Sequence, residues 1–389
     1  MKYSIIVPVF NRPDEVDELL ESLSNQTQRD FEVIIVEDGS AKTCKDVCDK
    51  YADILALHYY AKENSGPGQS RNYGAERANG EWLIILDSDV VLPEGYLEAV
   101  DKQVESGQWI VDSYDYQTSA DHYDHKTSAE NNDVQGNHNC SLSTINSQLS
   151  NILAAFGGPD AAHPSFTPVQ KAISYSMTSF FTTGGIRGGK AKLDKFYPRS
   201  FNMGIRRDVY LQLGGFSKMR FGEDIDFSYR IVEAGYKTRL FPEAWVWHKR
   251  RTDFRKFFRQ VYNSGIARIN LTKRHPGTLK LVHLLPTVFT LGVIGLILIS
   301  AVGRALMHYV DRDQFYWMCF APWIPILLYS LIICVDSTIR NRSLWVGLLS
   351  IPAAFVQLMG YGLGFIESWW KRCVLKQDEF TAFERTFYN

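Results

Sequence analysis

The sequence predicts an α/β domain with a mostly parallel sheet and helices on both faces, followed by an all-α membrane region. Two observations lead to this prediction. From residue 1 to about 115, short apolar runs alternate with amphipathic stretches, which is the pattern of βαβ units. Beyond residue 281, three apolar stretches each approach the ~20 residues that cross a bilayer. With 389 residues, the chain can hold one large domain and such a region.

The first part of the chain supplies the expected strands. Two of them are continuous apolar runs, as expected for strands covered on both faces. Helices should lie between them, one opened by a proline and one closed by a C-cap glycine. The expected elements are strands at Ser4–Val9, Phe31–Val36 and Trp82–Leu86, a helix opened by Pro13, and a helix over residues 68–79 closed by Gly80.

The middle of the chain breaks this rhythm. Residues 117–170 are rich in Ser, Asn, Asp and His, and we interpret them as a long excursion from the core. Regular structure should resume near Ile173, and the Gly-rich run Thr182–Lys192 is expected to be a mobile lid loop. Apolar residues 211–216 and 227–232 predict two helical segments that flank a short acidic motif.

The remainder predicts a membrane region. The three apolar stretches run from about Leu284 to Val302, Phe315 to Val335 and Leu344 to Ile366. A soluble helix that is apolar all round would need a very large core to cover it. The predicted organisation is a domain at 1–245, a basic juxtamembrane segment at 246–280, membrane segments at 281–368 and a polar tail at 369–389. The basic segment is expected either to meet diphosphate or anionic lipid, or to be a solvated face.

Charged loops predict the orientation. Basic residues precede the first and third spans, which predicts that both loops face the cytoplasm. They are Lys273, Arg274, Lys280, Arg340 and Arg342. Lys371, Arg372 and Lys376 follow the third span, where an odd number of crossings would place them outside. Either that segment re-enters, with a break at Pro352, Gly360, Gly362 and Gly364, or the charge bias is overridden here.

Other sequence features refine the expected location. The apolar stretch Ile5–Phe10 is too short for a signal-peptide core, so the N-terminal domain is expected in the cytoplasm, on the inner membrane. A net charge of −1 gives no basic field for nucleic acid, and membrane lipid is the expected partner of the apolar region.

The six cysteines show no zinc-site spacing. The polar excursion could in principle bind zinc through His122, His125, His138 and Cys140, which we do not favour.

Acidic residues end two neighbouring strands. Asp38 follows one apolar run, and Asp87 and Asp89 follow another. In an open α/β sheet, ligands bind at the carboxyl ends of the strands, so these acids should share one crevice. Asp87 and Asp89 flank one small residue, and their carboxylates can help to hold Mg²⁺ or Mn²⁺. His248, after a strand-like run, is either a third ligand of the metal or of a phosphate, or a structural residue.

Five motifs occur in one order along the first 224 residues. They are Val7–Arg12, Val36–Ser40, Gly68–Asn72 followed by Gly74, Leu86–Asp89 and Gly222–Asp224. This set resembles the family 2 glycosyltransferases, which have the GT-A fold. The resemblance implies a Rossmann-like sheet and an enzyme that takes a sugar from a nucleotide-sugar donor.

The resemblance also implies roles for the donor-side residues. Pro8 and Phe10 would line the nucleotide pocket through the backbone, and Asp38 would accept a hydrogen bond from the uracil imide. Arg71 would contact the base or its phosphates. Asp89 would ligate the metal directly, and Asp87 would contact ribose or reach the metal through water.

On the acceptor side, Asp224 resembles the general base of the family, and Glu223 would bind acceptor or donor hydroxyls. Elementary chemistry agrees, because the leaving diphosphate gains negative charge and the attacking hydroxyl must lose a proton. The alternative is that both acids only complement a helix N-terminus. One displacement without a covalent intermediate would invert the anomeric centre.

The expected function is therefore metal-dependent, inverting transfer of a sugar, from a donor that is UDP-linked by resemblance, to a hydroxyl of a membrane-associated or lipid-linked glycan. Three alternatives stay open. A polyprenyl phosphate acceptor is already ionised and needs no base. A nucleotidyltransferase would release pyrophosphate instead of a nucleoside diphosphate. A membrane scaffold would only bind nucleotides.

Overall fold

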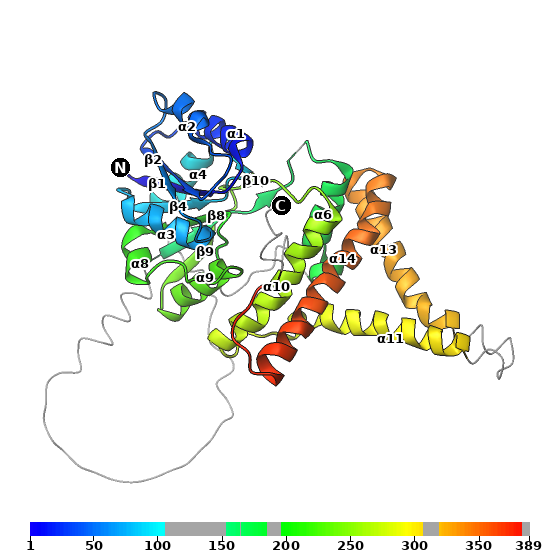
Figure 1. Ribbon diagram of the computed structural model, residues 1–389. Coiled ribbons are helices and arrows are strands. Elements are labelled where there is room, and N and C mark those ends of the chain that lie inside the picture. Colours follow the sequence, from blue (N-terminus) through cyan, green and yellow to red (C-terminus); the bar gives the residue numbers. More distant parts are fainter. Residues whose placement is uncertain (106–152, 164, 185–195, 306–318, 383–389) are drawn as a thin grey trace, which may run out of the picture.

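The computed structural model describes residues 1–105, 153–163, 165–184, 196–305 and 319–382 (Figure 1). Within these residues, an N-terminal domain carries a seven-stranded sheet, and a set of long helices extends from it. The polar excursion up to residue 152 and most of the Gly-rich run lie outside the described residues.

The large sheet has the strand order β3-β2-β1-β4-β8-β6-β9. The first four strands in this order are parallel, and β8 runs antiparallel to both of its neighbours. The strands are β1 Tyr3–Val9, β2 Phe31–Asp38, β3 Leu57–Lys62, β4 Trp82–Leu86, β6 Leu153–Gly157, β8 Asn202–Arg206 and β9 Lys237–Leu240. The predicted mostly parallel sheet is confirmed.

Helices cover both faces of this sheet, as expected for βαβ units. One core cluster joins the sheet to α1, α2 and α4, and another joins it to α3, α8 and α9. These helices are α1 Pro13–Ser24, α2 Lys45–Tyr51, α3 Pro67–Arg77, α4 Tyr96–Glu105, α8 Arg207–Gln212 and α9 Glu223–Glu233. A three-stranded sheet lies beside them, built from β5 Val90–Val91, β10 Val246–His248 and β7 Asp160–Ala161.

Four expectations about local structure are wrong. The helix over residues 68–79 ends at Arg77, and Gly80 instead lies against β1, where a Cβ would come 2.6 Å from the Ser4 nitrogen. The segment 211–216 is not helical beyond Gln212, because Gly214 and Gly215 take positive φ and turn the chain.

The excursion also ends earlier than expected. Leu153–Gly157 is the buried strand β6, paired with β8 and β9 inside the large sheet. Its apolar run is short and consists mainly of small residues, so its composition resembles a loop. Likewise Thr182 and Thr183 belong to the short helix α7, Phe180–Thr183, and not to a lid loop.

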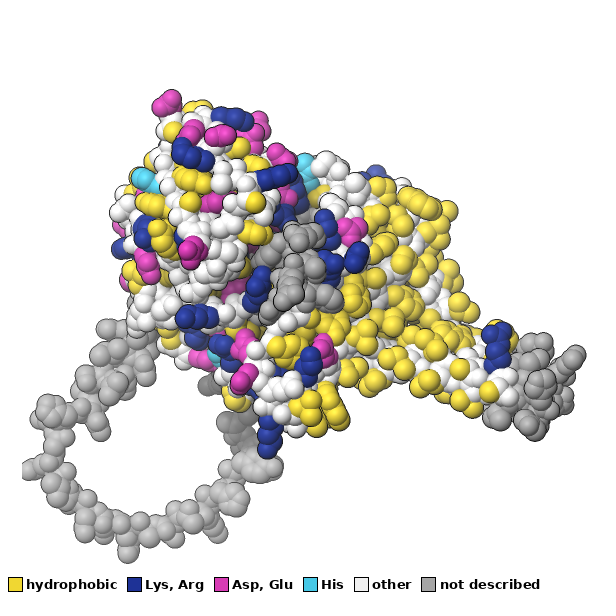
Figure 2. Space-filling view, in the orientation of Figure 1, with side chains coloured by type: hydrophobic (Ala, Val, Ile, Leu, Met, Phe, Trp, Pro, Cys, Tyr) yellow, Lys and Arg dark blue, Asp and Glu magenta, His cyan; other side chains and the backbone are white. Residues whose placement is uncertain are grey.

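Long helices form the rest of the molecule. They are α6 Pro168–Thr178, α10 Phe254–Arg274, α11 Leu285–Ala305, α13 Ile324–Asn341 and α14 Leu344–Trp369, with the short turns η1 Leu281–His283 and η2 Ala321–Trp323. Within the part of the chain that the structure describes, three segments are long and apolar enough to cross a membrane, namely Leu281–Ala305, Ala321–Asn341 and Leu344–Val374. Figure 2 shows their apolar surface beside the mixed polar surface of the N-terminal domain. The chain is therefore membrane-associated.

The helices α11, α13 and α14 form the three sides of a triangle (Figure 1). Gly347, near the start of α14, packs on the end of α13, and Gly362, near its end, packs on the start of α11. The far ends of α11 and α13 meet, where Trp323 Nε1 donates to Ser300 Oγ over 2.9 Å. α14 thus joins the two ends of an α11–α13 hairpin.

Close packing also joins α14 to α10. A Cβ on Gly364 would lie 2.1 Å from the carbonyl oxygen of Tyr262, and one on Gly265 would lie 2.2 Å from that of Tyr361. Small residues allow helix backbones to approach in this way. Of the two alternatives for the third segment, the one that placed a break at Pro352 and the three glycines is wrong, because α14 is one continuous helix and its glycines pack against other helices.

This packing predicts the effect of a single methyl group. Gly364→Ala should lower the free energy of unfolding by about 1–3 kcal/mol, because the methyl group overlaps a backbone oxygen of α10. The matched control is Gly292→Ala in α11, where a Cβ would have nothing within 4 Å. That change should be neutral or slightly stabilising, since alanine is the better helix former. Denaturant unfolding in detergent measures both, and equal effects would contradict the inferred contact.

Candidate active site

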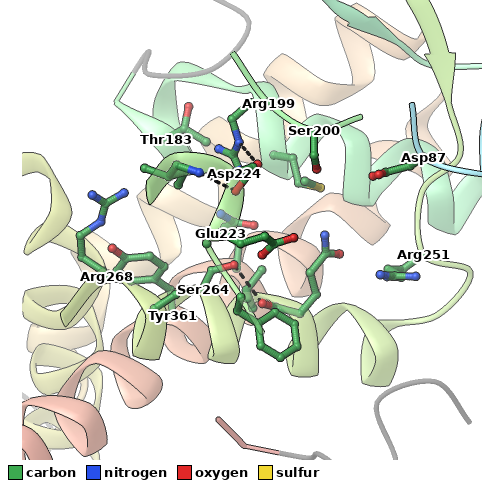
Figure 3. A pocket seen from close by; sticks show the side chains of 18 of the residues that line it. Asp87, Thr183, Arg199, Ser200, Glu223, Asp224, Arg251, Ser264, Arg268 and Tyr361 are labelled. Atoms are coloured by element: carbon green, nitrogen blue, oxygen red, sulfur yellow. Dashed lines mark hydrogen bonds and ion pairs between the residues drawn. The ribbon is translucent and has the colours of Figure 1, made fainter. Parts of the chain in front are cut away.

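One cavity of about 770 Å³ lies at the carboxyl ends of the strands, between the sheet and the helices α7, α10, α11 and α14. Its size is typical of small-ligand sites. All the predicted site residues except His248 line this cavity. They are Pro8, Phe10, Asp38, Arg71, Asp87, Asp89, Glu223 and Asp224. Figure 3 shows Asp87, Glu223 and Asp224 together with arginines from three segments.

Asp87, Asp89 and His248 come together beside the cavity. One ligand atom from each lies within 4.8 Å of the others. The cause is strand pairing: β10 runs antiparallel to β5, and His248 is the partner of Val90, directly after Asp89. His248 Nε2 lies 3.3 Å from Asp89 Oδ1. The structure thus unites the predicted metal residues, while their role as ligands stays a prediction.

The electrostatics of this cluster favour ionised side chains. Burial opposes the charge on Asp89, yet the neighbouring His248 holds the pKa of the Asp89 carboxyl well below its usual range. Burial likewise opposes the charge on His248, and the carboxylates of Asp89 and Asp160 outweigh it and raise the pKa of the imidazole to about 9. A divalent cation between Asp87, Asp89 and His248 would require the imidazole to lose its proton, because only the neutral ring can act as a ligand.

Arg71 connects the two sides of the cavity. Its Nη2 donates to Asp87 Oδ1 over 2.7 Å and its Nη1 donates to Glu223 Oε1 over 2.9 Å. Its guanidinium also lies over the ring of Phe216, 5.2 Å from the centroid. Arg71 was expected to contact the donor. In this structure it pairs with Asp87 and Glu223 and so links the metal cluster to the start of α9.

Asp224 lies at the start of α9, after Gly222, whose φ of +83° favours glycine. Arg199 Nε donates to Asp224 Oδ2 over 2.6 Å (Figure 3). Burial opposes the charge, but Arg199 lowers the pKa of the Asp224 carboxyl below its usual value. The carboxylate is therefore ionised and able to accept a proton, although its pair with Arg199 makes it a weaker base.

On the donor side, Asp38 lies at the end of β2 and lines the cavity. Its Oδ1 accepts from the backbone N–H of Ser65 over 2.9 Å, and its Oδ2 accepts from that of Gly66 over 2.9 Å. Lys62 donates to the same carboxylate. These contacts fix the loop before α3, so Asp38 has a structural task besides its expected contact with the base.

Comparison with known proteins assigns the family. Residues 4–157 match the model described as "Glycosyl transferase family 2", and residues 200–335 match the model "Glycosyl transferase family group 2". The chain belongs to glycosyltransferase family 2. The enzyme class expected from the motifs is thereby confirmed at the level of the family.

Curated relatives of this family 2 glycosyltransferase match its N-terminal part. An uncharacterized glycosyltransferase of Rickettsia bellii is 34% identical over 116 residues, which are 30% of this chain and 17% of that protein. The poly(ribitol-phosphate) beta-N-acetylglucosaminyltransferase TarS of Staphylococcus aureus is 38% identical over 93 residues, 23% of this chain and 16% of that protein. The match thus spans about a sixth of the length of each of these two relatives.

A solved structure supports the fold. The mannosyltransferase PcManGT from Pyrobaculum calidifontis, in complex with GDP-Man and Mn²⁺, superposes with a TM-score of 0.51 at 15% identity. The match covers 95% of this chain and 88% of that chain. The GT-A-type fold expected for this glycosyltransferase is confirmed, together with the helices that follow it.

Some residues of the site were not predicted from the sequence. Asp160 lies in β7, next to β10, with Oδ2 3.9 Å from His248 Nδ1, and it also accepts from Arg250. The ring of Phe201 stacks on His248, with centroids 4.9 Å apart. Both fix the imidazole from sides that only the fold brings together. Arg199, the partner of Asp224, precedes β8 and belongs to no motif.

Other sequence hypotheses have mixed outcomes. The zinc alternative and residues 185–192 of the Gly-rich run lie outside the described residues. The first three basic side chains of the juxtamembrane segment have three different surroundings, so they form neither a solvated face nor a single basic patch. Lys249 pairs with Glu18 over 2.7 Å, Arg250 pairs with Asp160, and Arg251 lines the cavity.

Glu223 should give the stability a pH dependence near neutrality. Burial raises the pKa of its carboxyl to about 7, although Arg71 opposes the shift. The folded chain then holds this proton at a higher pH than the unfolded chain, where the pKa is near 4.5. The contribution is fully present below about pH 4.5 and is lost as the pH rises through 7.

We therefore expect the wild type to lose on the order of 1–3 kcal/mol more stability than Glu223→Gln between pH 5 and pH 7.5. Thermal unfolding at both pH values measures this difference. Parallel curves for the two proteins would contradict the raised pKa.

Proposed function

We propose that this family 2 glycosyltransferase moves a sugar from a nucleotide-sugar to a hydroxyl group, with inversion and with a divalent cation. One observation carries this proposal: a single cavity is lined by the two aspartates of the Asp87, Asp89 and His248 cluster and by the buried acid Asp224 at the start of α9. Such an arrangement can bind a diphosphate on one side and remove a proton on the other.

The cluster fits a divalent cation by its chemistry. Two carboxylates and one imidazole are ligands that Mn²⁺ accepts, whereas Mg²⁺ prefers oxygen alone. Asp89 Oδ1 is buried and makes an ion pair with His248 Nε2 but no hydrogen bond, which leaves a lone pair for a cation. When bound, the cation neutralises the negative charge that grows on the leaving diphosphate. Mn²⁺ is therefore the proposed cofactor, with Mg²⁺ as the alternative.

Each protein side chain of the site then has its own role in the reaction. Asp224 accepts the proton of the attacking hydroxyl, whose oxygen bonds to C1 of the sugar while the bond from C1 to the diphosphate breaks. The diphosphate leaves with the electron pair of that bond. Arg71 supplies a positive charge beside Asp87, where the phosphates are expected, and Glu223 orients it. One displacement without a covalent intermediate gives a product of inverted configuration.

The donor is proposed to be UDP-linked, on the resemblance of the Asp38 motif. The name of the Staphylococcus relative gives N-acetylglucosaminyl transfer, while the solved mannosyltransferase holds GDP-Man. The decisive experiment incubates the detergent-solubilised protein with Mn²⁺ and a panel of UDP- and GDP-sugars. Release of a nucleoside diphosphate supports the proposal. Release of pyrophosphate indicates a nucleotidyltransferase, and stabilisation without turnover indicates a nucleotide-binding scaffold.

A polyprenyl phosphate is the second candidate acceptor. The ion pair between Asp224 and Arg199 favours it, because a paired carboxylate is a weaker base and a phosphate needs none. We prefer the hydroxyl, because Arg199 keeps the Asp224 carboxyl ionised inside the cavity, where it can accept a proton. Substitution of Asp224 distinguishes the two acceptors, as described below.

We further propose that two helices cross the membrane, α11 and α13, and that α14 lies along its surface on the side of the catalytic domain. Contacts between the end of α10 and the tail support this topology. Arg274 Nη2 lies 2.9 Å from Glu379 Oε2, and Lys273 donates to the carbonyl of Arg372 over 2.7 Å. All three groups of basic residues then lie on one side, which removes the conflict with the charge bias.

Labelling in intact cells tests this topology. Cys373 is exposed just after α14, so a membrane-impermeant maleimide should reach it only after permeabilisation of a cytoplasmic membrane. A cysteine introduced by Ala305→Cys at the far end of α11 should react without permeabilisation. The background carries Cys140→Ser, and peptide mapping identifies the labelled site. Labelling of Cys373 in intact cells would show that α14 crosses.

A further inference from the structure

The cavity has two chemically different ends. The end next to the sheet holds the acids and arginines described above. The opposite end is built from η1, α11, α13 and α14, and its lining is mostly apolar, with His283 and Gln357 as its polar side chains. Its aliphatic and aromatic residues are Val282, Leu285, Pro286, Phe289, Tyr329 and Leu358.

This apolar end reaches the membrane-facing surface of the molecule. Phe180 of α7 and Leu285 of α11 both line the cavity, and they are also 65% and 56% exposed. The helices around them carry the apolar surface of Figure 2. The cavity therefore connects the catalytic acids with the layer that the membrane region occupies.

The wall of the apolar end is an aromatic cluster inside the helix triangle. Phe289 packs on Tyr329 and on Phe355, with ring centroids 5.7 Å and 5.4 Å apart. These rings come from α11, α13 and α14, so the cluster forms only when all three helices meet. Aromatic contacts of this kind hold a fixed shape beside the cavity.

The chemistry of this end suits hydrocarbon and not sugar. A glycan would need many polar partners, since each buried hydroxyl without a hydrogen bond costs free energy. A hydrocarbon chain needs no polar partners, so it suits the aliphatic and aromatic side chains of this end. The occupant must also present a nucleophile at Asp224, because the same cavity contains that acid.

We propose that the acceptor is a lipid whose hydroxyl-bearing head lies at Asp224 and whose hydrocarbon chain fills the apolar end. The chain enters from the bilayer between Phe180 and Leu285. This inference rests on the proposed glycosyl transfer and narrows its acceptor from any compound with a hydroxyl group to a membrane lipid held by its chain.

The test fills the apolar end with a larger side chain. Leu358→Trp places an indole where a buried leucine of α14 lines the cavity, and Val282→Trp does so from η1. The matched control is Val288→Trp, which changes the same residue type on α11 at a site 64% exposed and outside the cavity lining. Each protein is reconstituted in vesicles of total lipid from the host membrane and given radiolabelled nucleotide-sugar with Mn²⁺.

The expected result is a loss of at least tenfold of label in the organic extract for Leu358→Trp and Val282→Trp, with wild-type labelling for Val288→Trp. Binding of the nucleoside diphosphate, unchanged within about twofold, checks that the variants are folded. Wild-type labelling of lipid by both cavity variants would overturn the inference, as would label found only in water-soluble product. In those cases glycosyl transfer itself stands. Absence of any transfer by the wild type would overturn both.

Discussion

Asp224→Asn is expected to reduce turnover by about 10²–10⁴-fold, the usual contribution of a general base. The amide oxygen can still accept from Arg199 Nε, so the local structure should survive. Nucleoside diphosphate affinity should stay within about twofold, because Asp224 is not one of the three residues of the metal cluster. Steady-state kinetics and calorimetric titration measure the two quantities.

The control for this variant is Glu233→Gln, an acid-to-amide change at the other end of α9. Its side chain is 55% exposed and does not line the cavity. It should keep wild-type turnover. Retained turnover in Asp224→Asn would remove the base from the mechanism and favour the ionised polyprenyl phosphate as acceptor.

Asp89→Asn is expected to reduce turnover by about 1000-fold, which corresponds to about 4 kcal/mol of transition-state stabilisation. The charge that holds the cation is lost, and His248 keeps fewer negative neighbours. The stabilisation of the wild type by Mn²⁺ should disappear as well. Thermal unfolding with and without Mn²⁺ gives a readout that does not depend on activity.

Asp160→Asn provides the comparison. Asp160 supports His248 from behind and is not a proposed ligand, so its loss should weaken Mn²⁺ binding by about 10–100-fold. High Mn²⁺ should then restore turnover in Asp160→Asn and not in Asp89→Asn. If chelation leaves wild-type turnover unchanged, or if Mn²⁺ stabilises Asp89→Asn like the wild type, the cluster is not a catalytic metal site.

Local sequence patterns determined much of the N-terminal domain. The apolar runs of β1, β2 and β4 appear in the structure within two residues of their expected bounds, because burial on both faces demands continuous apolar residues. The same reasoning succeeded for α1, whose proline fixes its first turn. It failed for Leu153–Gly157, since a short run of mainly small residues becomes a strand only through its neighbours β8 and β9.

The candidate site divides in the same way. Asp87 and Asp89 could be found because they directly follow a buried strand, and strand ends form the ligand edge of such sheets. Asp160 and Arg199 could not, because neither stands at a distinctive sequence spacing. Their positions beside His248 and Asp224 come from the pairing of β7 with β10 and from the segment before β8.

The membrane region shows most clearly what could not be predicted from the sequence alone. Length and apolar composition by themselves determined that three long helices exist, because a bilayer sets the number of residues that a span needs. Only the tertiary structure decided that the glycines of α14 are contact points with α10 and α11 and not breaks. The apolar composition of a segment can be read from its own residues. Helix contacts instead depend on residues about 100 positions apart, such as Tyr262 and Gly364, that meet only in the folded chain.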